Sequence, residues 1–436
     1  MLEVEQNSTI RAIVVCPCLI GDNRRLSPDR RLNEAVDLSK AINVDICYFE
    51  SLILKEIKSA TYFSKGVIEK IGNIATQNDA FLLIVDTSLT PVQQRNLEKA
   101  LNLKVIDRTA LILEIFGERA KTSEGKLQVE LAHLTYQRSR LVRSWTHLER
   151  QRGGAGFLGG PGEKQIELDK RLLDDKIVKI KKALQKVKNT RTLQRGNRKK
   201  VPYPVVALTG YTNAGKSSLF NLLTQQNVMV ADQLFATLDT VVRKIKWQND
   251  FEAVLSDTVG FISDLPHELV MAFRSTLEEV LEADVIIHVR DISNPDTEAQ
   301  RKDVLDVLHH LGLKDIETQN NYIEILNKID LLSLEDKNIL LQKISRRSQV
   351  MVAVSAVTGE GMDDLIDLIK EKLKQDQKVF QLCLPVHQGK ALSIVYQYAE
   401  VDSITQDDDN LYLTIKTDDA KFHKLTSLLN KPEGNK

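Results

Sequence analysis

Over residues 1–120 the chain alternates short, continuous apolar runs with stretches of helical periodicity. Apolar runs of about four to eight residues are typical of strands buried on both faces, as in parallel sheets covered by helices. We therefore predict an N-terminal α/β domain, in which the sequence shows no phosphate loop and no catalytic constellation. The predicted strands are residues 12–16, 45–49 and 81–85, and the predicted helices are 31–42 and 91–101.

A seven-residue period replaces this alternation over residues 121–200. Leucines recur at every seventh position from Leu127 to Leu148, and a second series of the same period runs from Ile166 to Val187. Two such stripes joined by a compact loop predict an antiparallel helical hairpin. Each predicted arm of about 25 residues is roughly 37 Å long at about 1.5 Å per residue.

Residues 152–164, RGGAGFLGGPGEK, place six glycines in ten positions at the far end of this predicted hairpin. Small residues let backbone amides approach a crowded surface, and the two bulky apolar side chains can stack or wedge against RNA bases. A flexible connector is the alternative interpretation. The candidate RNA contacts are Arg150, Arg152, Gly156, Phe157, Leu158 and Gly160.

Charge divides unevenly along the chain. The 436 residues carry 60 Lys and Arg and 60 Asp and Glu, yet residues 126–200 hold 20 basic against 7 acidic residues. This excess of 13 positive charges attracts polyanions such as RNA, so we predict phosphate contacts along the hairpin. Solvated charged faces of a long hairpin are the alternative. The basic residues predicted to contact phosphates are Arg138, Arg140, Arg143, Lys179, Lys181 and Lys182.

Chain length, composition and cysteine content limit the classes of protein to which the sequence can belong. A chain of this length predicts about three or four domains. Its 42% apolar and 28% charged residues are typical of a soluble globular protein. No apolar run approaches the roughly 18 residues of a membrane helix, and the N-terminus lacks a signal-peptide pattern. The four cysteines argue against a disulfide framework, so we predict a cytoplasmic monomer without a membrane span.

The strongest motif is GYTNAGKS at residues 210–217, which follows the strand-like run 203–209 and opens a helical pattern. In this context G-x-x-x-x-G-K-[ST] is a phosphate loop, because glycines let the backbone wrap around oxyanions at a helix N-terminus. Lys216 is expected to reach the β- and γ-phosphates, and the Ser217 hydroxyl to bind Mg²⁺. The predicted nucleotide contacts here are Gly210, Tyr211, Thr212, Asn213, Ala214, Gly215, Lys216, Ser217 and Ser218.

Three further motifs follow, each after a predicted strand. Asp257 of DTVG is expected to hold Mg²⁺ through water, and the N–H of Gly260 to approach the γ-phosphate. Asp330 of NKID accepts hydrogen bonds from N1–H and N2–H₂ of guanine, a donor pair that adenine lacks. Ser355-Ala356 supports the same base. The predicted contacts are Asp257, Thr258, Val259, Gly260, Asn327, Lys328, Ile329, Asp330, Ser355, Ala356 and Val357.

A predicted switch segment, FATLD, lies between the first two motifs. Thr237 is expected to complete the Mg²⁺ shell, with Thr240 as the alternative. Phe261 stands where many regulatory GTPases carry a glutamine that positions the attacking water, so we predict slow intrinsic hydrolysis that needs rearrangement or an outside partner. Packing of Phe261 beneath the switch is the alternative. The predicted switch contacts are Phe235, Ala236, Thr237, Leu238 and Asp239.

The predicted architecture is α/β. A P-loop GTPase domain with a mostly parallel sheet flanked by helices covers residues 201–375. It is preceded by the N-terminal α/β domain and the antiparallel helical hairpin, and followed by a small α+β domain over 376–436. The residues alone leave open an RNA-stimulated GTPase, or a guanine-nucleotide switch that binds a protein partner through its N-terminal domain or hairpin. An ATP-driven RNA remodeller is disfavoured by Asp330.

With these residues placed, the sequence resembles the HflX family of translation-associated GTPases over nearly its whole length. The resemblance implies Mg²⁺-dependent GTP hydrolysis and association with the large ribosomal subunit, with the glycine loop reaching ribosomal RNA. It also implies a role in splitting or rescuing stalled ribosomes under stress. The sequence departs from the family pattern at Lys164, Thr240 and Arg290. The matching stretches are 90–98, 145–151, 160–163, 210–217, 235–239 and 257–266.

Overall fold

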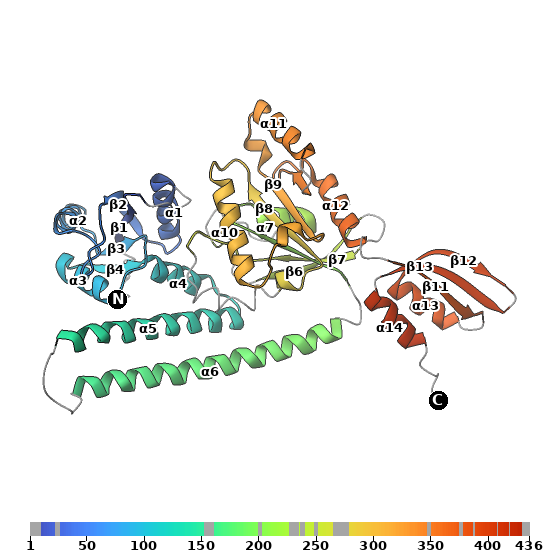
Figure 1. Ribbon diagram of the computed structural model, residues 1–436, viewed down its shortest axis with the longest axis horizontal. Helices are drawn as coiled ribbons and strands as arrows, with labels where there is room; N and C mark the ends of the chain where they lie inside the picture. Colours follow the sequence, from blue (N-terminus) through green and yellow to red (C-terminus); the bar gives the residue numbers. More distant parts are fainter. Residues whose placement is uncertain are drawn as a thin grey trace, which may run out of the picture.

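A computed structural model of the protein describes residues 10–21, 27–151, 161–198, 203–225, 235, 240–247, 252–264, 279–346, 350–374, 378–386, 389–407, 409–417 and 419–429. Within these ranges a four-stranded, a six-stranded and a three-stranded sheet each carry their own helices. Figure 1 shows the four-stranded sheet at one end of the molecule, the six-stranded sheet in the middle and the three-stranded sheet at the other end. This arrangement confirms the predicted fold class.

The N-terminal sheet is built from parallel strands. Its strands are β1 (Arg11–Leu19), β2 (Asp45–Leu54), β3 (Leu82–Val85) and β4 (Lys104–Asp107), and its helices are α1 (Pro28–Lys40), α2 (Lys65–Gln77), α3 (Pro91–Leu101) and α4 (Arg108–Arg119). The order β2-β1-β3-β4 makes β1 a central strand, which explains why its residues from Ala12 to Cys18 are buried. The sequence pattern predicts β1, β2, β3, α1 and α3 but misses β4, α2 and α4.

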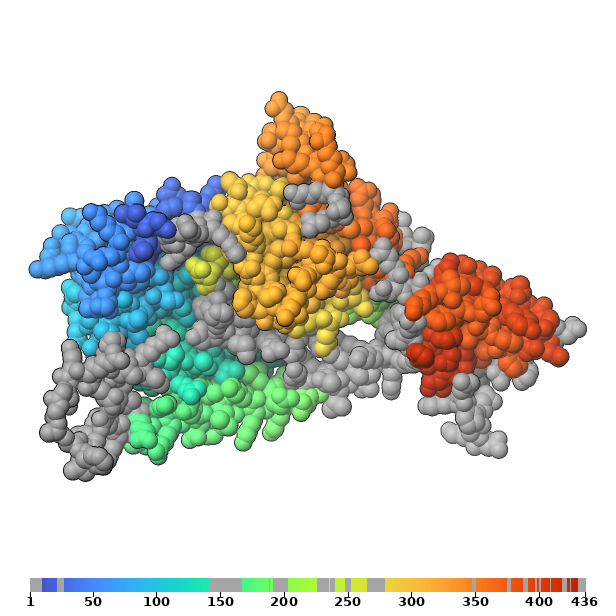
Figure 2. All heavy atoms as spheres, viewed as in Figure 1, coloured from blue at the N-terminus to red at the C-terminus, as the bar shows by residue number. Residues whose placement is uncertain are grey.

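The hairpin consists of α5 (Ser123–Gln151) and α6 (Pro161–Arg198), which lie side by side and antiparallel (Figure 1). Leu134 of α5 and Ile177 and Ile180 of α6 are buried between them, as the seven-residue period predicts. Figure 2 shows the described part of α6 along one flank of the molecule. The side chains of Arg143 and Arg150, two of the predicted RNA contacts, lie outside the described residues, although their backbone belongs to α5. The other predicted contacts at this end of the hairpin lie wholly outside the described residues: Arg152, Gly156, Phe157, Leu158 and Gly160.

The second half of α5 is anchored to the N-terminal sheet by Asp107, which ends β4 and caps α4. Its carboxylate accepts hydrogen bonds from Tyr136 Oη at 2.9 Å and from Arg140 Nη1 at 3.2 Å. Arg140 also donates to Gln94 and retains 17% side-chain exposure. Arg138 pairs with Asp174 of α6 at 2.8 Å. The prediction that Arg140 contacts RNA phosphates is therefore corrected, since its guanidinium group is held by Asp107 and Gln94. The prediction for Arg138 stays a prediction, because its side chain is 45% exposed.

We expect Arg140→Ala to loosen α5 from the N-terminal domain. Hydrogen bonds to charged groups contribute about 1.5–3 kcal/mol each, and the buried carboxylate of Asp107 would lose its cation. Hydrogen exchange of the α5 backbone amides should show correspondingly lower protection. Arg138→Ala is the matched control, because its ion pair is 45% and 41% exposed and such pairs contribute only about 0–1 kcal/mol. Equal loss of protection in both variants would contradict the anchor.

The middle sheet has the order β10-β9-β8-β5-β7-β6, in which β6 alone among the described strands runs antiparallel. Its strands are β5 (Val205–Gly210), β6 (Val241–Lys246), β7 (Glu252–Asp257), β8 (Val285–Asp291), β9 (Tyr322–Asn327) and β10 (Met351–Ala353). Its helices are α7 (Lys216–Thr224), α10 (Thr297–His310), α11 (Leu334–Ser345) and α12 (Met362–Lys374), with the short helices η2 (Ile316–Thr318) and η3 (Ile329–Leu331). The carboxyl ends of the parallel strands meet at one edge, where an α/β sheet binds its ligands.

The C-terminal sheet is antiparallel and has the order β11-β13-β12. It consists of β11 (Lys378–Pro385), β12 (Glu400–Gln406) and β13 (Asn410–Thr417), with α13 (Gly389–Tyr398) and α14 (Asp419–Leu429). Leu413, Ile415 and Leu425 are buried in its small core, which confirms the predicted α+β class. None of the helices in the described residues is both long and apolar enough to cross a bilayer.

Candidate functional site

The four motifs predicted from the sequence meet at one edge of the middle sheet. The phosphate loop joins β5 to α7, DTVG begins at the last residue of β7, NKID at the last residue of β9, and Ser355 follows β10. Gly215 has a φ of +90°, and a Cβ there would lie 2.2 Å from Asn327 Nδ2. The close approach of the phosphate loop to NKID therefore requires glycine at this position.

Lys216 opens α7 and its side chain folds back into the phosphate loop. Its Nζ donates to the carbonyl oxygens of Gly210 at 3.2 Å and Tyr211 at 2.7 Å. Burial lowers the pKa of Lys216 to about 8, and the nearby carboxylate of Asp257 opposes this shift. A buried ammonium with a lowered pKa is poorly compensated, so an anion such as a phosphate would be attracted to this position.

Two oxygen groups suited to Mg²⁺ lie against each other beside this lysine. The Ser217 hydroxyl donates to Asp257 Oδ2 at 2.7 Å, and Asp257 is buried. Hydroxyl and carboxylate oxygens are the hard donors that Mg²⁺ prefers, and it usually keeps several waters in addition. The pair therefore fits the ion, which would supply positive charge next to the phosphates. Of the predicted switch segment the structure describes Phe235, whereas Ala236, Thr237, Leu238 and Asp239 lie outside the described residues.

The predicted guanine site is held together by side chains from three loops. Asn327 donates from Nδ2 to Ala214 O at 2.8 Å and accepts from the Ala356 N–H at 3.1 Å, so it ties the phosphate loop to the loop after β10. Asp330 is exposed, and its Oδ1 accepts from the Ser355 hydroxyl at 2.6 Å. NKID and Ser355-Ala356 thus form one unit, as a shared contact with one base requires.

The structure adds residues from the N-terminal domain that the sequence does not indicate. Tyr211 Oη donates to Glu34 Oε2 at 2.6 Å and accepts from the Ser263 N–H at 2.7 Å. The Ser263 hydroxyl donates to Glu34 Oε1 at 2.8 Å, and Arg108 donates to Ser263 O at 2.8 Å. Burial and then the Glu34 carboxylate raise the pKa of Tyr211 well above its usual value, so this phenol stays a hydrogen-bond donor.

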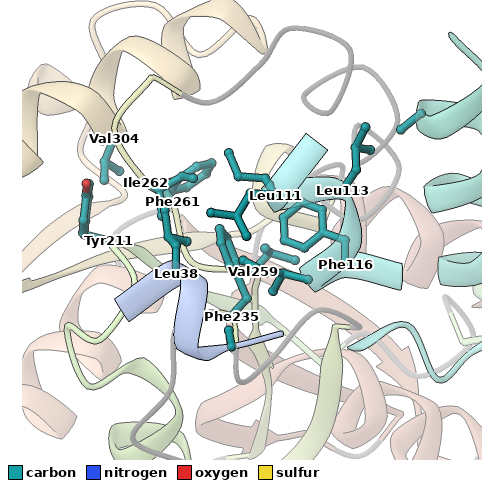
Figure 3. Packing of buried hydrophobic residues seen from close by; sticks show 14 of the residues in the cluster. Leu38, Leu111, Leu113, Phe116, Tyr211, Phe235, Val259, Phe261, Ile262 and Val304 are labelled. Atoms are coloured by element: carbon teal, nitrogen blue, oxygen red, sulfur yellow. The ribbon is translucent and has the colours of Figure 1, made fainter. Parts of the chain in front are cut away.

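Apolar side chains complete this contact between domains (Figure 3). Phe261 is 2% exposed, and its ring lies in a cluster with Leu111 of α4. Phe235 packs edge-on against Phe116 of α4, with ring centroids 4.6 Å apart. The interpretation that Phe261 packs in the core is confirmed in this structure. Helix α4 therefore contacts both segments that flank the candidate phosphate site.

Two polar residues of β8 near the site, His288 and Arg290, have structural roles. His288 on β8 is buried and shares a 2.7 Å hydrogen bond with Tyr322 Oη, while burial and then Arg290 lower its pKa to about 3. Arg290, where the resemblance leads us to expect an apolar residue, is 4% exposed and forms ion pairs with Glu324 and Glu298. The departure at position 290 is therefore accommodated by a carboxylate on the neighbouring strand.

Profiles of known families match the chain in consecutive stretches. Residues 29–117 match the family described as GTP-binding GTPase N-terminal, and residues 119–198 match GTP-binding GTPase Middle Region. Residues 205–328 match the family described as 50S ribosome-binding GTPase, and residues 339–433 match HflX C-terminal domain. These matches together span most of the chain and include the phosphate loop, the predicted switch segment, DTVG and Ser355-Ala356, whereas Asp330 of NKID lies between two of them.

Individual proteins are also similar to this chain. The chain is 45% identical to GTPase HflX of Magnetococcus marinus over 396 residues, 91% of this chain and 90% of that one. It is 42% identical to GTPase HflX of Escherichia coli over 348 residues, 80% of each chain. A GTP-binding protein from Sulfolobus solfataricus, solved in complex with GDP, aligns over 84% of this chain and 99% of that one, at 24% identity and a TM-score of 0.44.

Proposed function

The chain belongs to the HflX family of GTPases, and on that premise we propose that it binds the large ribosomal subunit through its hairpin and hydrolyses GTP there. The observation that carries the proposal is the surface of α6. Leu173, Ile177 and Ile180 face α5, whereas the basic residues of the helix whose side chains the structure describes are exposed to solvent, where RNA phosphates can reach them. The exposed basic residues are Lys170, Arg171, Lys176, Lys179, Lys181, Lys182 and Lys186.

The residues at the edge of the middle sheet bind the nucleotide and the metal ion in this proposal. Lys216 and the backbone amides of the phosphate loop bind the β- and γ-phosphates, and Asp330 selects guanine. Ser217 and Asp257 hold Mg²⁺, directly or through water, and the ion neutralises charge on the phosphates. The intrinsic reaction is slow, because the ring of Phe261 neither donates nor accepts a hydrogen bond, and the ribosome stimulates it.

The glycine-rich segment 152–164 reaches ribosomal RNA in this proposal. The hydrogen bond between Arg140 of α5 and Asp107 at the end of β4 holds the hairpin against the N-terminal domain. In this proposal the protein is a cytoplasmic monomer that splits or rescues stalled ribosomes under stress. The profile description 50S ribosome-binding GTPase over residues 205–328 supports the same partner.

Co-sedimentation with purified large ribosomal subunits tests the proposal. We expect binding that depends on the nucleotide analogue present and weakens steeply with salt. The double variant Lys179→Glu, Lys182→Glu should bind about tenfold more weakly, and its salt dependence should be flatter by about one contact per lysine removed.

The matched control is Lys314→Glu with Lys343→Glu, which reverses two exposed lysines of the nucleotide domain. It should bind subunits as the unmodified protein does, because neither lysine lies on the hairpin. Failure of the unmodified protein to co-sediment in every nucleotide state would overturn the ribosome proposal and leave GTP hydrolysis intact.

A further inference from the structure

Within the described part of the chain, the hydroxyl of Thr212 in the phosphate loop lacks a hydrogen bond, whereas the hydroxyls of Ser217 and Thr258 each make one. Ser217 donates to Asp257, and Thr258 donates to Leu208 O at 2.6 Å. Thr212 is only 7% exposed, yet among the described residues its Oγ1 has no hydrogen-bond partner. Burying a hydroxyl without a partner costs free energy, so such a group needs an explanation beyond packing.

The position of Thr212 points to the terminal phosphate. A Cβ built on Gly260 would lie 2.8 Å from Thr212 Cγ2 and 3.0 Å from Lys216 Nζ. The side chains of Thr212 and Lys216 therefore border the same point against the backbone of DTVG. Because Lys216 is the group that reaches the β- and γ-phosphates, Thr212 stands at the γ-phosphate end of the loop.

The backbone around Thr212 is fixed by the segment that carries Phe261. The Thr212 N–H donates to Phe261 O at 2.7 Å, and the Phe261 N–H donates to Gly210 O at 3.1 Å. The ring of Phe261 is buried in the cluster with α4, so residue 261 offers no side-chain hydrogen bond to a water at the γ-phosphate. The hydroxyl of Thr212 lies next to this position and can make the hydrogen bond that the ring of Phe261 cannot.

We propose that the Thr212 hydroxyl contacts the attacking water and the γ-phosphate during GTP hydrolysis, an inference that rests on the nucleotide placement given above. A hydroxyl offers one donor and two acceptor lone pairs, so it can accept a hydrogen bond from the water and donate one to a phosphate oxygen. The water oxygen bonds to the γ-phosphorus while the bond to the β,γ-bridging oxygen breaks. GDP leaves with that electron pair, a water proton passes to the phosphate, and Thr212 is unchanged.

Two substitutions in the full-length protein separate the hydroxyl from the shape of the side chain. Thr212→Val keeps the shape, and we expect kcat to fall about tenfold to a hundredfold, as when one preorganised donor is lost. The thermal midpoint of the nucleotide-free protein should not fall, since a buried hydroxyl without a partner is being removed. Thr212→Ser keeps the hydroxyl and should retain kcat within about threefold.

Thr209→Val is the matched control. Thr209 on β5 is also buried with an Oγ1 that has no partner among the described residues, so the same change there should leave kcat as it is. Thr212→Val with unchanged kcat would overturn the proposal, as would equal losses in Thr212→Ser or in Thr209→Val. Failure of the nucleotide placement itself would be recognised separately, by Lys216→Ala retaining full affinity for GTP.

Discussion

Asp330→Asn is expected to weaken GTP binding by about a thousandfold, in line with sites built to hydrogen-bond a ligand group that is then lost or reversed. In the proposed site the carboxylate of Asp330 accepts from both N1–H and N2–H₂ of guanine. An asparagine amide in the same orientation places its own N–H₂ against the N2–H₂ of the base, so a hydrogen bond becomes a contact between two donors. Affinities measured with fluorescent GTP and GDP derivatives give the result directly.

The same variant should gain affinity for xanthosine triphosphate. Xanthine carries a carbonyl at position 2, which accepts from the asparagine N–H₂, while its N1–H still donates to the asparagine oxygen. Asp336→Asn on α11 is the control, because its side chain is exposed and lies outside the four motifs. The assignment of Asp330 would be wrong if the Asp330→Asn variant bound GTP as before, or if it bound neither nucleotide while remaining folded.

The motifs around the nucleotide were predictable because each is short and continuous in sequence. A phosphate loop needs only a strand, eight residues and a helix, and parallel strands then bring the ends of β5, β7 and β9 to one edge. The helical hairpin was predictable for a similar reason, since a seven-residue period is a local property. Its described core of Leu134, Ile177 and Ile180 follows from that period alone.

Contacts between distant segments left no such pattern. Glu34 and Ser263 lie 229 positions apart, and a single glutamate on an amphipathic helix indicates only a solvated face. The positive charge of Arg140 predicts an RNA contact, because the sequence near Arg140 gives no sign of its actual partner. That partner, Asp107, lies 33 positions away on a strand of four residues. Helix α4 was missed because RTALILEIFGER has apolar residues on every side, which fits a helix buried between two domains and shows no clear period.

Helix α4 joins the parts of the molecule that must communicate if, as proposed, the ribosome stimulates GTP hydrolysis. It packs against Phe235 and Phe261 of the nucleotide domain, and only residues 120–122 separate it from α5. The start of α5 and the segments beside the candidate phosphate site are therefore connected through one helix. A buried ion network at the first residue of α4 holds this arrangement, and its removal has the second large expected effect.

We expect Arg108→Ala to destabilise the protein by about 3–5 kcal/mol, the range for removing one partner of a buried ion pair. Arg108 is 5% exposed and pairs with the buried carboxylate of Asp86 and with Glu34, whose side chain is 12% exposed, in addition to its hydrogen bonds with Ser263. Without the guanidinium, Glu34 loses its ion pair, and the buried Asp86 loses one of its two cations and keeps Arg31. Calorimetry should show a lower midpoint for the transition that includes the N-terminal and nucleotide domains.

Arg30→Ala is the control, because Arg30 also bridges the two domains, to Asp296 at 3.5 Å, but keeps 44% side-chain exposure. Exposed pairs contribute only about 0–1 kcal/mol, so its midpoint should barely change. Adding Glu34→Gln to Arg108→Ala should recover part of the loss, since one uncompensated charge is removed, and a double-mutant cycle then isolates the pair. Equal effects of Arg108→Ala and Arg30→Ala would show that burial of this network contributes nothing to holding the domains together.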